Sequence, residues 1–214
     1  MENLAIARIL EFLPGIILGL TIHEFSHAWM AKRCGDTTSE LQGRITLNPF
    51  KHIDAMGFLM LLIAGFGWAK PVQFNEQNLK NPKTDIIKIA VAGPFSNAIT
   101  AMILSIAFSL FSHFTSGNFS SAVGIANEVI MYAIYINWGL FIFNLIPLPP
   151  LDGSHLLLNQ FRRFPRLYEG FYRYGSYIFL GLILVTVFTK VNLFPIWPAM
   201  QFLGNGFLSL VGYS

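Results

Sequence analysis

Long, nearly uncharged apolar runs constrain the fold of this chain more than any other feature. Residues 86–112 and 122–148 each contain a single charged residue, and residues 174–189 contain none. A helix that crosses the hydrocarbon core of a membrane needs roughly 20 predominantly apolar residues. Backbone that faces lipid must satisfy its own hydrogen bonds, which a helix does. The runs therefore predict an all-α polytopic membrane protein.

The overall composition agrees with this prediction. Hydrophobic residues make up 54% of the 214 residues and charged residues only 12%, whereas soluble domains carry about 25% charged residues. So few charged side chains cannot cover a water-facing body of this size. We therefore expect residues 1–214 to form a single membrane-embedded domain. The single cysteine, Cys34, excludes an internal disulfide bond and a four-cysteine zinc site.

The number of membrane crossings is less sharply defined. Four stretches are expected to cross: residues 4–31, 86–112, 122–148 and 174–189. The apolar run at 55–68 is short and has charged residues at both ends, which favours a re-entrant segment. Alternating residues at 44–47 permit a short strand or hairpin, and prolines leave open whether 191–213 crosses. We therefore expect four to six transmembrane helices with a short re-entrant or β-hairpin element after the first.

Basic residues gather in three of the polar loops, whereas residues 113–121 contain no lysine or arginine. By the positive-inside rule, these three loops face the cytoplasm and the 113–121 loop lies outside. Because the charges are spread over loops that flank the membrane, they form no separate basic face for nucleic acid. The residues are Lys32, Arg33, Arg44 and Lys51; Lys70, Lys80, Lys83 and Lys88; and Arg162, Arg163, Arg166 and Arg173.

Two histidines and a glutamate stand at the end of the first apolar stretch. His23 and His27 are four residues apart, which puts both imidazoles on one helix face about one turn apart. This spacing suits two nitrogens that bind one Zn²⁺ ion at about 2.0–2.1 Å. Glu24 can then serve as the general base for a water at the metal. The pattern is short, but ionisable residues at membrane depth are functional candidates by default.

A catalytic zinc site needs a third protein ligand and one open position. Asp152 is the candidate, in the segment NLIPLPPLDG at 144–153. The three prolines of this segment end the preceding helix, and irregular backbone at membrane depth is buried in protein or lines a cavity. The charge distribution puts Asp152 at the same cytoplasmic end as His23 and His27. We therefore predict one zinc ion held by these three residues.

Together these motifs resemble the site-2 protease family of intramembrane metalloproteases, especially its small prokaryotic members. The similarity runs from about residue 15 to about residue 160. Larger members carry an inserted peptide-binding domain, for which this chain has no polar stretch of sufficient length. The shared segments are HEFSH at 23–27, GRITLNPFKHID at 43–54, WAKPV at 68–72, GPFSN at 93–97 and NLIPLPPLDG at 144–153.

The resemblance implies a function and a location. It implies hydrolysis of a peptide bond in or near the transmembrane segment of a membrane protein, as in regulated intramembrane proteolysis. The partners are then that substrate and the lipid bilayer. It also implies a prokaryotic inner or plasma membrane, with the active site toward the cytoplasm. Within the site, Glu24 is expected to be the base, and Asn144 to position the substrate backbone or stabilise the oxyanion. No cofactor besides one zinc ion is expected, and the oligomeric state is left open.

Several polar residues keep two interpretations. Asn97 either assists the chemistry or forms hydrogen bonds between helices. His52 and Asp54 either shape the entrance of the site or fix a loop. His155 lies three residues after Asp152, so on a resumed helix it could orient that carboxylate. As a fourth ligand it would close the open position of the metal.

Two other functions are weighed against the protease. A transporter or channel also has ionisable residues in the membrane, but an ion path would need polar groups along its whole length. The outer halves of the expected spans are nearly all apolar. An inactive relative that binds membrane partners has no reason to keep the costly His23, Glu24, His27 and Asp152 set. Both alternatives therefore rank below the protease.

Overall fold

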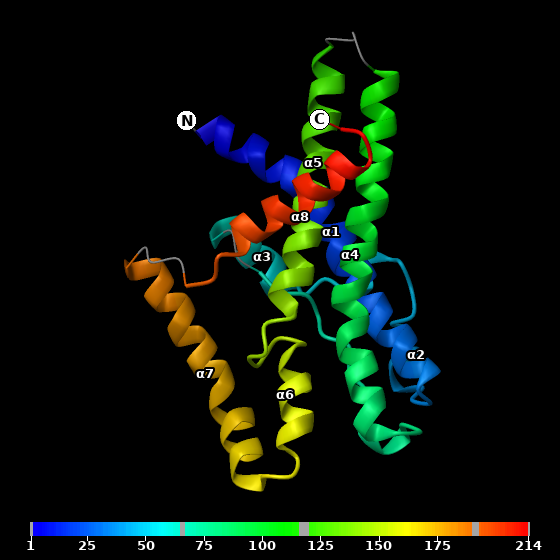
Figure 1. The fold of residues 1–214 in the computed structure, drawn as a ribbon, viewed down its shortest axis with the longest axis vertical. Helices are drawn as coiled ribbons and strands as arrows, with labels where there is room; N and C mark the ends of the chain where they lie inside the picture. The colour runs from blue at the N-terminus through cyan, green and yellow to red at the C-terminus, as the bar shows by residue number, and fades with distance from the viewer. Residues whose placement is uncertain (1, 65–66, 116–119, 190–192, 214) are drawn as a thin grey trace.

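The computed structural model describes residues 2–64, 67–115, 120–189 and 193–213. Within them the chain is helical and contains no strand, so the predicted all-α class is confirmed. The main helices are α1 (Glu2–Arg33), α2 (Thr38–Leu41), α3 (Ala55–Ala64), α4 (Pro82–Phe114), α5 (Ser121–Asn144), α6 (Ser154–Phe161), α7 (Pro165–Thr189) and α8 (Ile196–Leu210), as Figure 1 shows. Two short 3-10 helices, η1 (Pro49–Lys51) and η2 (Glu76–Asn78), lie between α2 and α4.

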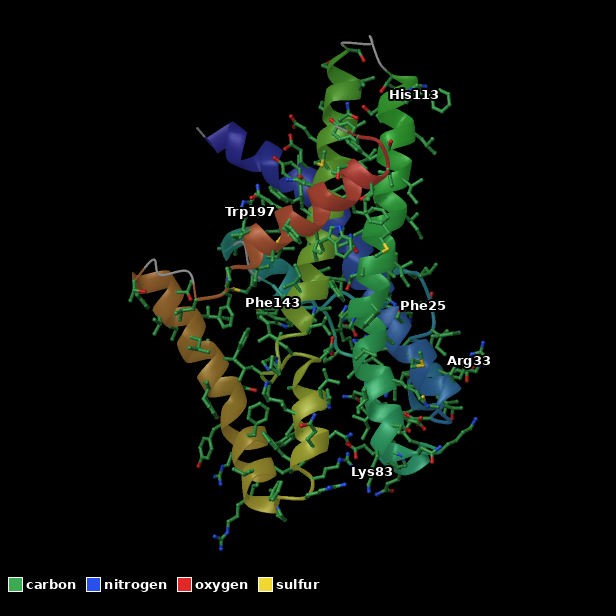
Figure 2. All side chains as sticks on the ribbon, viewed as in Figure 1. Phe25, Arg33, Lys83, His113, Phe143 and Trp197 are labelled. Carbon is green, nitrogen blue, oxygen red and sulfur yellow. The ribbon has the colours of Figure 1, made fainter. Side chains whose placement is uncertain are left out.

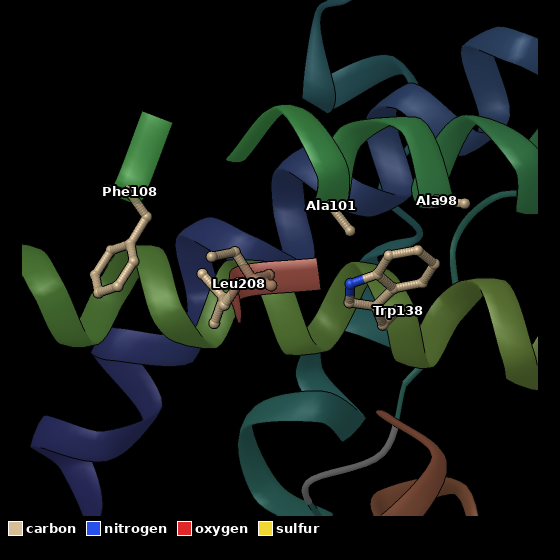
Figure 3. Close-up of a cluster of buried hydrophobic side chains, with 6 residues drawn as sticks. Ala98, Ala101, Phe108, Trp138 and Leu208 are labelled. Atoms are coloured by element: carbon tan, nitrogen blue, oxygen red, sulfur yellow. The ribbon is translucent and has the colours of Figure 1, made fainter. Parts of the chain in front are cut away.

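Helices α1, α4 and α5 pack against one another and form the centre of the fold. The chain runs up α4 and returns down α5, while α1 crosses both and α8 lies across α5 (Figure 1). A buried apolar cluster joins α4, α5 and α8, and Figure 3 shows Trp138 among the small side chains of α4. The members of this cluster are Ala98, Ala101, Phe108, Ile134, Trp138 and Leu208.

Two of the described helices, α4 and α5, are long and apolar enough to cross a membrane, with 33 and 24 residues. The outer face of α4 carries an exposed stripe at helical spacing, formed by Ile99, Ile103, Ile106 and Leu110. Contiguous exposed apolar surface of this kind is rare in soluble proteins. Helix α3 has ten residues, or about 15 Å, half the thickness of a hydrocarbon core. The predicted number of four to six spans is therefore not confirmed.

The residues just before and just after α3 and its following loop lie side by side. Ile53 and Ala69 form an isolated antiparallel bridge, and the Lys70 N–H donates to the His52 carbonyl at 2.8 Å. Between these paired residues the chain forms the helix α3 rather than two strands, so the β-hairpin alternative is not confirmed. The strand permitted at 44–47 is also absent: Ile45 and Thr46 lie in a bend between Gly43, which has a φ of +67°, and the Asn48 cap of η1.

The break after α5 agrees with the sequence. The helix ends at Asn144, ahead of the three prolines, and a turn of irregular backbone leads to α6 at Ser154. The Gly153 N–H donates to the Asn144 carbonyl at 2.6 Å, which folds the loop back onto the end of α5. Asp152 is thereby held beside the helix end that precedes it.

Candidate metal and catalytic site

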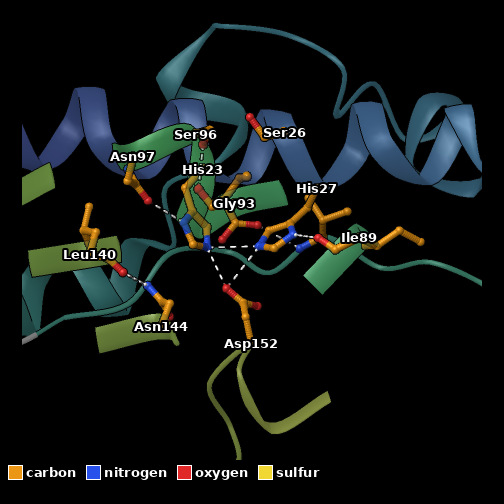
Figure 4. Close-up of polar contacts among 12 residues, drawn as sticks. His23, Ser26, His27, Ile89, Gly93, Ser96, Asn97, Leu140, Asn144 and Asp152 are labelled. Atoms are coloured by element: carbon orange, nitrogen blue, oxygen red, sulfur yellow. Dashed lines mark hydrogen bonds and ion pairs between the residues drawn. The ribbon is translucent and has the colours of Figure 1, made fainter. Parts of the chain in front are cut away.

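His23, His27 and Asp152 converge on one point between α1 and the loop after α5 (Figure 4). Asp152 Oδ2 lies 3.0 Å from His23 Nε2 and 3.3 Å from His27 Nε2. The two Nε2 atoms are 3.0 Å apart. Both histidines are buried and the carboxylate is largely so. The three residues that the sequence predicts as ligands therefore form one group that could hold a metal ion.

The other ring nitrogen of each histidine has its own partner. His23 Nδ1 donates to Asn97 Oδ1 at 2.7 Å, and His27 Nδ1 donates to the Ile89 carbonyl at 2.7 Å. With the protons on Nδ1, both Nε2 atoms present lone pairs toward each other and toward the carboxylate. Such an arrangement is repulsive without a cation, and it matches the outer hydrogen bonds that orient metal-binding imidazoles.

The spacing of the three atoms fits zinc. Around an ion about 2.0–2.1 Å from each ligand, tetrahedral geometry separates the ligand atoms by about 3.3–3.4 Å. The separations of 3.0–3.3 Å are close to that value. Two imidazoles and one carboxylate also leave the fourth position open, as hydrolytic zinc sites require.

Gly93 of α4 keeps the space beside the two imidazoles clear. A Cβ at this position would lie 2.4 Å from His27 Nε2 and 2.7 Å from His23 Nε2. Any side chain at residue 93 would therefore occupy the volume where the lone pairs meet. The close approach explains why a glycine stands at this point of α4, in the GPFSN segment.

Glu24 lines a cavity of about 160 Å³ together with His27, Asp152 and His155. The carboxylate is 8% exposed, and its Oε2 atom accepts a hydrogen bond from the Val72 N–H at 3.0 Å. Val72 belongs to segment 68–74, which contains no helix and forms one wall of the cavity. A carboxylate in this position faces the same space as the metal group without being part of it, as the sequence predicts for a base.

Two asparagines extend the polar group into the helix bundle. Asn97 accepts from His23, and its amide donates to the Gly19 carbonyl and to Asn137 Oδ1, both at 3.0 Å. It therefore bonds between helices and orients a candidate ligand as well. Asn137, fully buried on α5, was missed at the sequence level. The available signal is an amide in the middle of an apolar run, one of three asparagines between residues 122 and 148.

The remaining candidates take different places. Asn144 lies beside the metal group in Figure 4, where its amide donates to the Leu140 carbonyl of its own helix at 3.0 Å. His155 lines the same cavity as Glu24. His52 donates to the Thr46 carbonyl at 2.8 Å, and Asp54 accepts from the Gly57 N–H at 2.8 Å. Both contacts lie within the loop and at the start of α3, as the loop-fixing interpretation predicts.

Comparison with known proteins places the chain in a family. The signature of Peptidase family M50 matches residues 11–186. The chain is 35% identical over 189 residues to a Bacillus subtilis protein named "Putative zinc metalloprotease YwhC", which covers 87% of this chain and 84% of that protein. It is 30% identical over 146 residues to "Putative zinc metalloprotease Rip2" of Mycolicibacterium smegmatis, covering 66% of this chain and 53% of that protein.

An archaeal relative is also similar. The chain is 28% identical over 156 residues to "Putative zinc metalloprotease MJ0611" of Methanocaldococcus jannaschii, with 70% of this chain and 71% of that protein covered. No solved structure matches. The chain belongs to peptidase family M50, the site-2 protease family, and is a zinc metalloprotease. The predicted family and the predicted zinc cofactor are thus confirmed.

Proposed function

We propose that this zinc metalloprotease cleaves within the membrane, at a peptide bond in or near the transmembrane segment of a membrane-protein substrate. His23, His27 and Asp152 hold the zinc ion, and Glu24 is the general base. The observation that carries the proposal is the position of the converging His-His-Asp group. It lies where α1 crosses α4, a helix long and apolar enough to span the bilayer.

The chemistry of the site divides between the metal and the protein. A bound zinc ion supplies Lewis-acid polarisation of the scissile carbonyl. Glu24 removes a proton from the attacking water and delivers it to the leaving amine. The Val72 N–H holds one oxygen of that carboxylate, which leaves the other free to face the cavity. His23 and His27 are kept in their metal-binding orientation by Asn97 and by the Ile89 carbonyl.

Asn144 is proposed to donate a hydrogen bond to the substrate backbone or to the developing oxyanion. Its place at the end of α5, beside the metal group in Figure 4, supports this role. To act so, the amide must exchange its bond to the Leu140 carbonyl for one to the substrate. That carbonyl is already the acceptor of a helix bond within α5, so its loss of the Asn144 amide is tolerable.

The site is proposed to face the cytoplasm of a prokaryotic cell, across its inner or plasma membrane. In Figure 2, His113 lies near the top of the molecule, whereas Arg33 lies in the lower half and Lys83 near the lower end. Along the sequence, residues 113–121 contain no lysine or arginine whereas the other polar loops are basic, and the positive-inside rule favours the cytoplasm for the basic side. Water and zinc would enter from there. Both bacterial and archaeal relatives agree with a prokaryotic source.

A substrate helix must unwind before it is cut, because the carbonyls of a helix are already hydrogen-bonded. Segment 68–74 beside Glu24 offers non-helical backbone next to which an unwound stretch can lie. Cleavage of this kind is the chemical step of regulated intramembrane proteolysis, in which the released fragment carries a signal.

The test is cleavage of a library of single-span substrates in proteoliposomes by the wild type and by Glu24→Gln. The variant should retain zinc and lose cleavage at least about 100-fold, since it cannot accept the proton of the attacking water. Glu128→Gln, at an exposed position on α5, is the matched control and should cleave like the wild type. Equal cleavage by Glu24→Gln and the wild type would overturn the proposal.

A further inference from the structure

A second cavity lies beside the catalytic cleft. It has a volume of about 230 Å³. Its lining comes from α1, α3, α5 and the start of segment 68–74. Its described lining is apolar apart from Thr21 and His52. The mechanism above uses none of its residues, so the cavity needs another explanation.

The cavity continues the same strip of α1 that carries Glu24. Ile17 and Thr21 line it, and successive spacings of four and three residues put both on the helix face of Glu24. At about 1.5 Å per residue, Thr21 precedes Glu24 by roughly 5 Å along the axis. On α5 the lining residue Leu140 stands one turn before Asn144. The cavity is thus the next hollow along the cleft, toward the middle of the bundle.

Segment 68–74 forms a wall of both the apolar cavity and the cavity that holds Glu24. Trp68 and Ala69 line the apolar cavity, and Pro71 and Val72 line the cavity that holds Glu24. Three residues of chain span at most about 10 Å, so the two spaces lie within that distance of each other along the segment. An unwound peptide that follows this segment would pass the apolar cavity within about three residues of the bond at the metal group.

We propose that this apolar cavity is a specificity subsite, which takes a large aliphatic or aromatic side chain of the substrate within three residues of the scissile bond. This inference rests on the proposed intramembrane protease function. An apolar cavity of about 150 Å³ holds a benzene molecule, so a space of 230 Å³ admits the side chain of Leu, Met or Phe.

His52 supplies one of the two polar side chains in the described lining, but it does not identify the occupant. The ring is 1% exposed and its Nε2 donates to the Thr46 carbonyl. Its Nδ1 atom has no hydrogen-bond partner among the described residues. In the neutral ring that nitrogen is an acceptor, and buried acceptors are normally paired. That nitrogen is covered by protein atoms, so the choice of a peptide rather than a lipid chain as the occupant rests on the wall that the cavity shares with the metal site.

The experiment measures which side chains the protease accepts. Single-span substrates carry Ala, Leu or Phe at each of the three positions on either side of the scissile bond. Wild-type protein in proteoliposomes should prefer Leu or Phe over Ala at one of these positions by about 10- to 100-fold in kcat/KM. Ile17→Phe, which fills the cavity, should lower cleavage of the Leu and Phe substrates at least about 10-fold relative to cleavage of the Ala substrate.

Two further variants complete the design. Phe58→Ala enlarges the cavity and should raise the relative rate for a Trp substrate at the preferred position. Ile103→Phe adds the same bulk as Ile17→Phe on the outer face of α4, where the side chain is 60% exposed, and should keep the wild-type preference. Zinc content and a cooperative thermal unfolding transition report that each variant is folded.

The outcomes separate this inference from the function on which it rests. If Glu24→Gln cleaves as the wild type does, the proposed function fails. If the wild type is active and Glu24→Gln is not, two results overturn the subsite alone. One is equal cleavage of the Ala, Leu and Phe substrates by the wild type. The other is a loss with Ile17→Phe that is the same for all substrates, as a cavity occupied by a lipid chain would give.

Discussion

The guanidinium of Arg44 lies 3.7 Å from the Glu24 carboxylate, deep in the protein, where Arg44 is 4% exposed. Its Nη2 atom also donates to the Lys70 carbonyl. The Glu24 Oε2 atom near this guanidinium is the one that accepts the Val72 N–H. Arg44 therefore joins the proposed base to the wall of the cleft.

Removing this cation should lower catalysis and spare the metal. In Arg44→Met the carboxylate loses its buried partner, and we expect kcat to fall about 10- to 100-fold with little change in KM or zinc content. Arg44→Lys keeps the charge and should recover part of the loss. Steady-state cleavage kinetics provide the measurement. A rise in KM with unchanged kcat would show that Arg44 serves substrate binding instead.

Asn97 should be needed for zinc affinity, because it holds the Nδ1 proton of His23. Replacement by Ala leaves that imidazole free to turn, and loss of such an outer partner costs about 10- to 100-fold in metal affinity. Competition with a chelator of known affinity measures the change. Asn205→Ala, at an exposed position on α8, is the control. An unchanged affinity in Asn97→Ala would restrict Asn97 to packing between helices.

Gly93→Ala is expected to abolish zinc binding. The new Cβ would lie 2.4 Å from His27 Nε2, so either the imidazole or α4 must move. Gly124→Ala makes the same change on α5, where an added Cβ meets nothing within 4 Å. The zinc content of both purified variants, measured by atomic absorption, tests the expectation. Stoichiometric zinc in Gly93→Ala would show that the helix shifts without cost.

Asp36 should stabilise the fold outside the membrane. It accepts hydrogen bonds from Thr38, from the Asn75 N–H and from the Asn78 amide. Burial raises the pKa of Asp36, but these hydrogen bonds outweigh burial and hold the pKa below its ordinary value. The carboxylate therefore contributes stability above its unfolded pKa of about 3.9, and this contribution is lost as the pH falls through the lower folded value.

Asp36→Asn is thus expected to lose about 2–3 kcal/mol of unfolding free energy at pH 7. The difference from the wild type should shrink as the pH is lowered below about 4. Denaturant unfolding in detergent at several pH values gives both quantities. Glu169→Gln, at an exposed position on α7, should behave as the wild type does throughout. Equal stability of Asp36→Asn at pH 7 would contradict the prediction.

The sequence predicts that His23, His27 and Asp152 meet, as they do in the structure, because helix spacing and proline breaks fix the positions of these residues locally. Helical spacing brings His23 and His27 to one face, and the prolines before Asp152 force the turn that carries it. The helical class follows equally from the apolar runs. The number of membrane crossings does not, because α3 and α8 are shorter than a bilayer is thick.

Contacts between distant residues lay beyond the sequence. His23 and Asn97 are separated by 74 positions, and nothing in either local pattern pairs them. The contact of Glu24 with Val72 uses a backbone N–H, which every residue except proline offers. Asn137 lacks a motif altogether. Such partners are fixed by how α1, α4 and α5 cross, which single-sequence periodicity does not determine.

The hydrogen bond from Val72 to Glu24 has a mechanical consequence. Segment 68–74 borders both the apolar cavity and the metal group, and its Val72 N–H is fastened to the carboxylate at 3.0 Å. A peptide that moved this wall would therefore also move the Glu24 carboxylate, because the hydrogen bond joins the two. Occupancy of the apolar cavity and the position of the proposed base would thus be coupled through this segment and its one hydrogen bond.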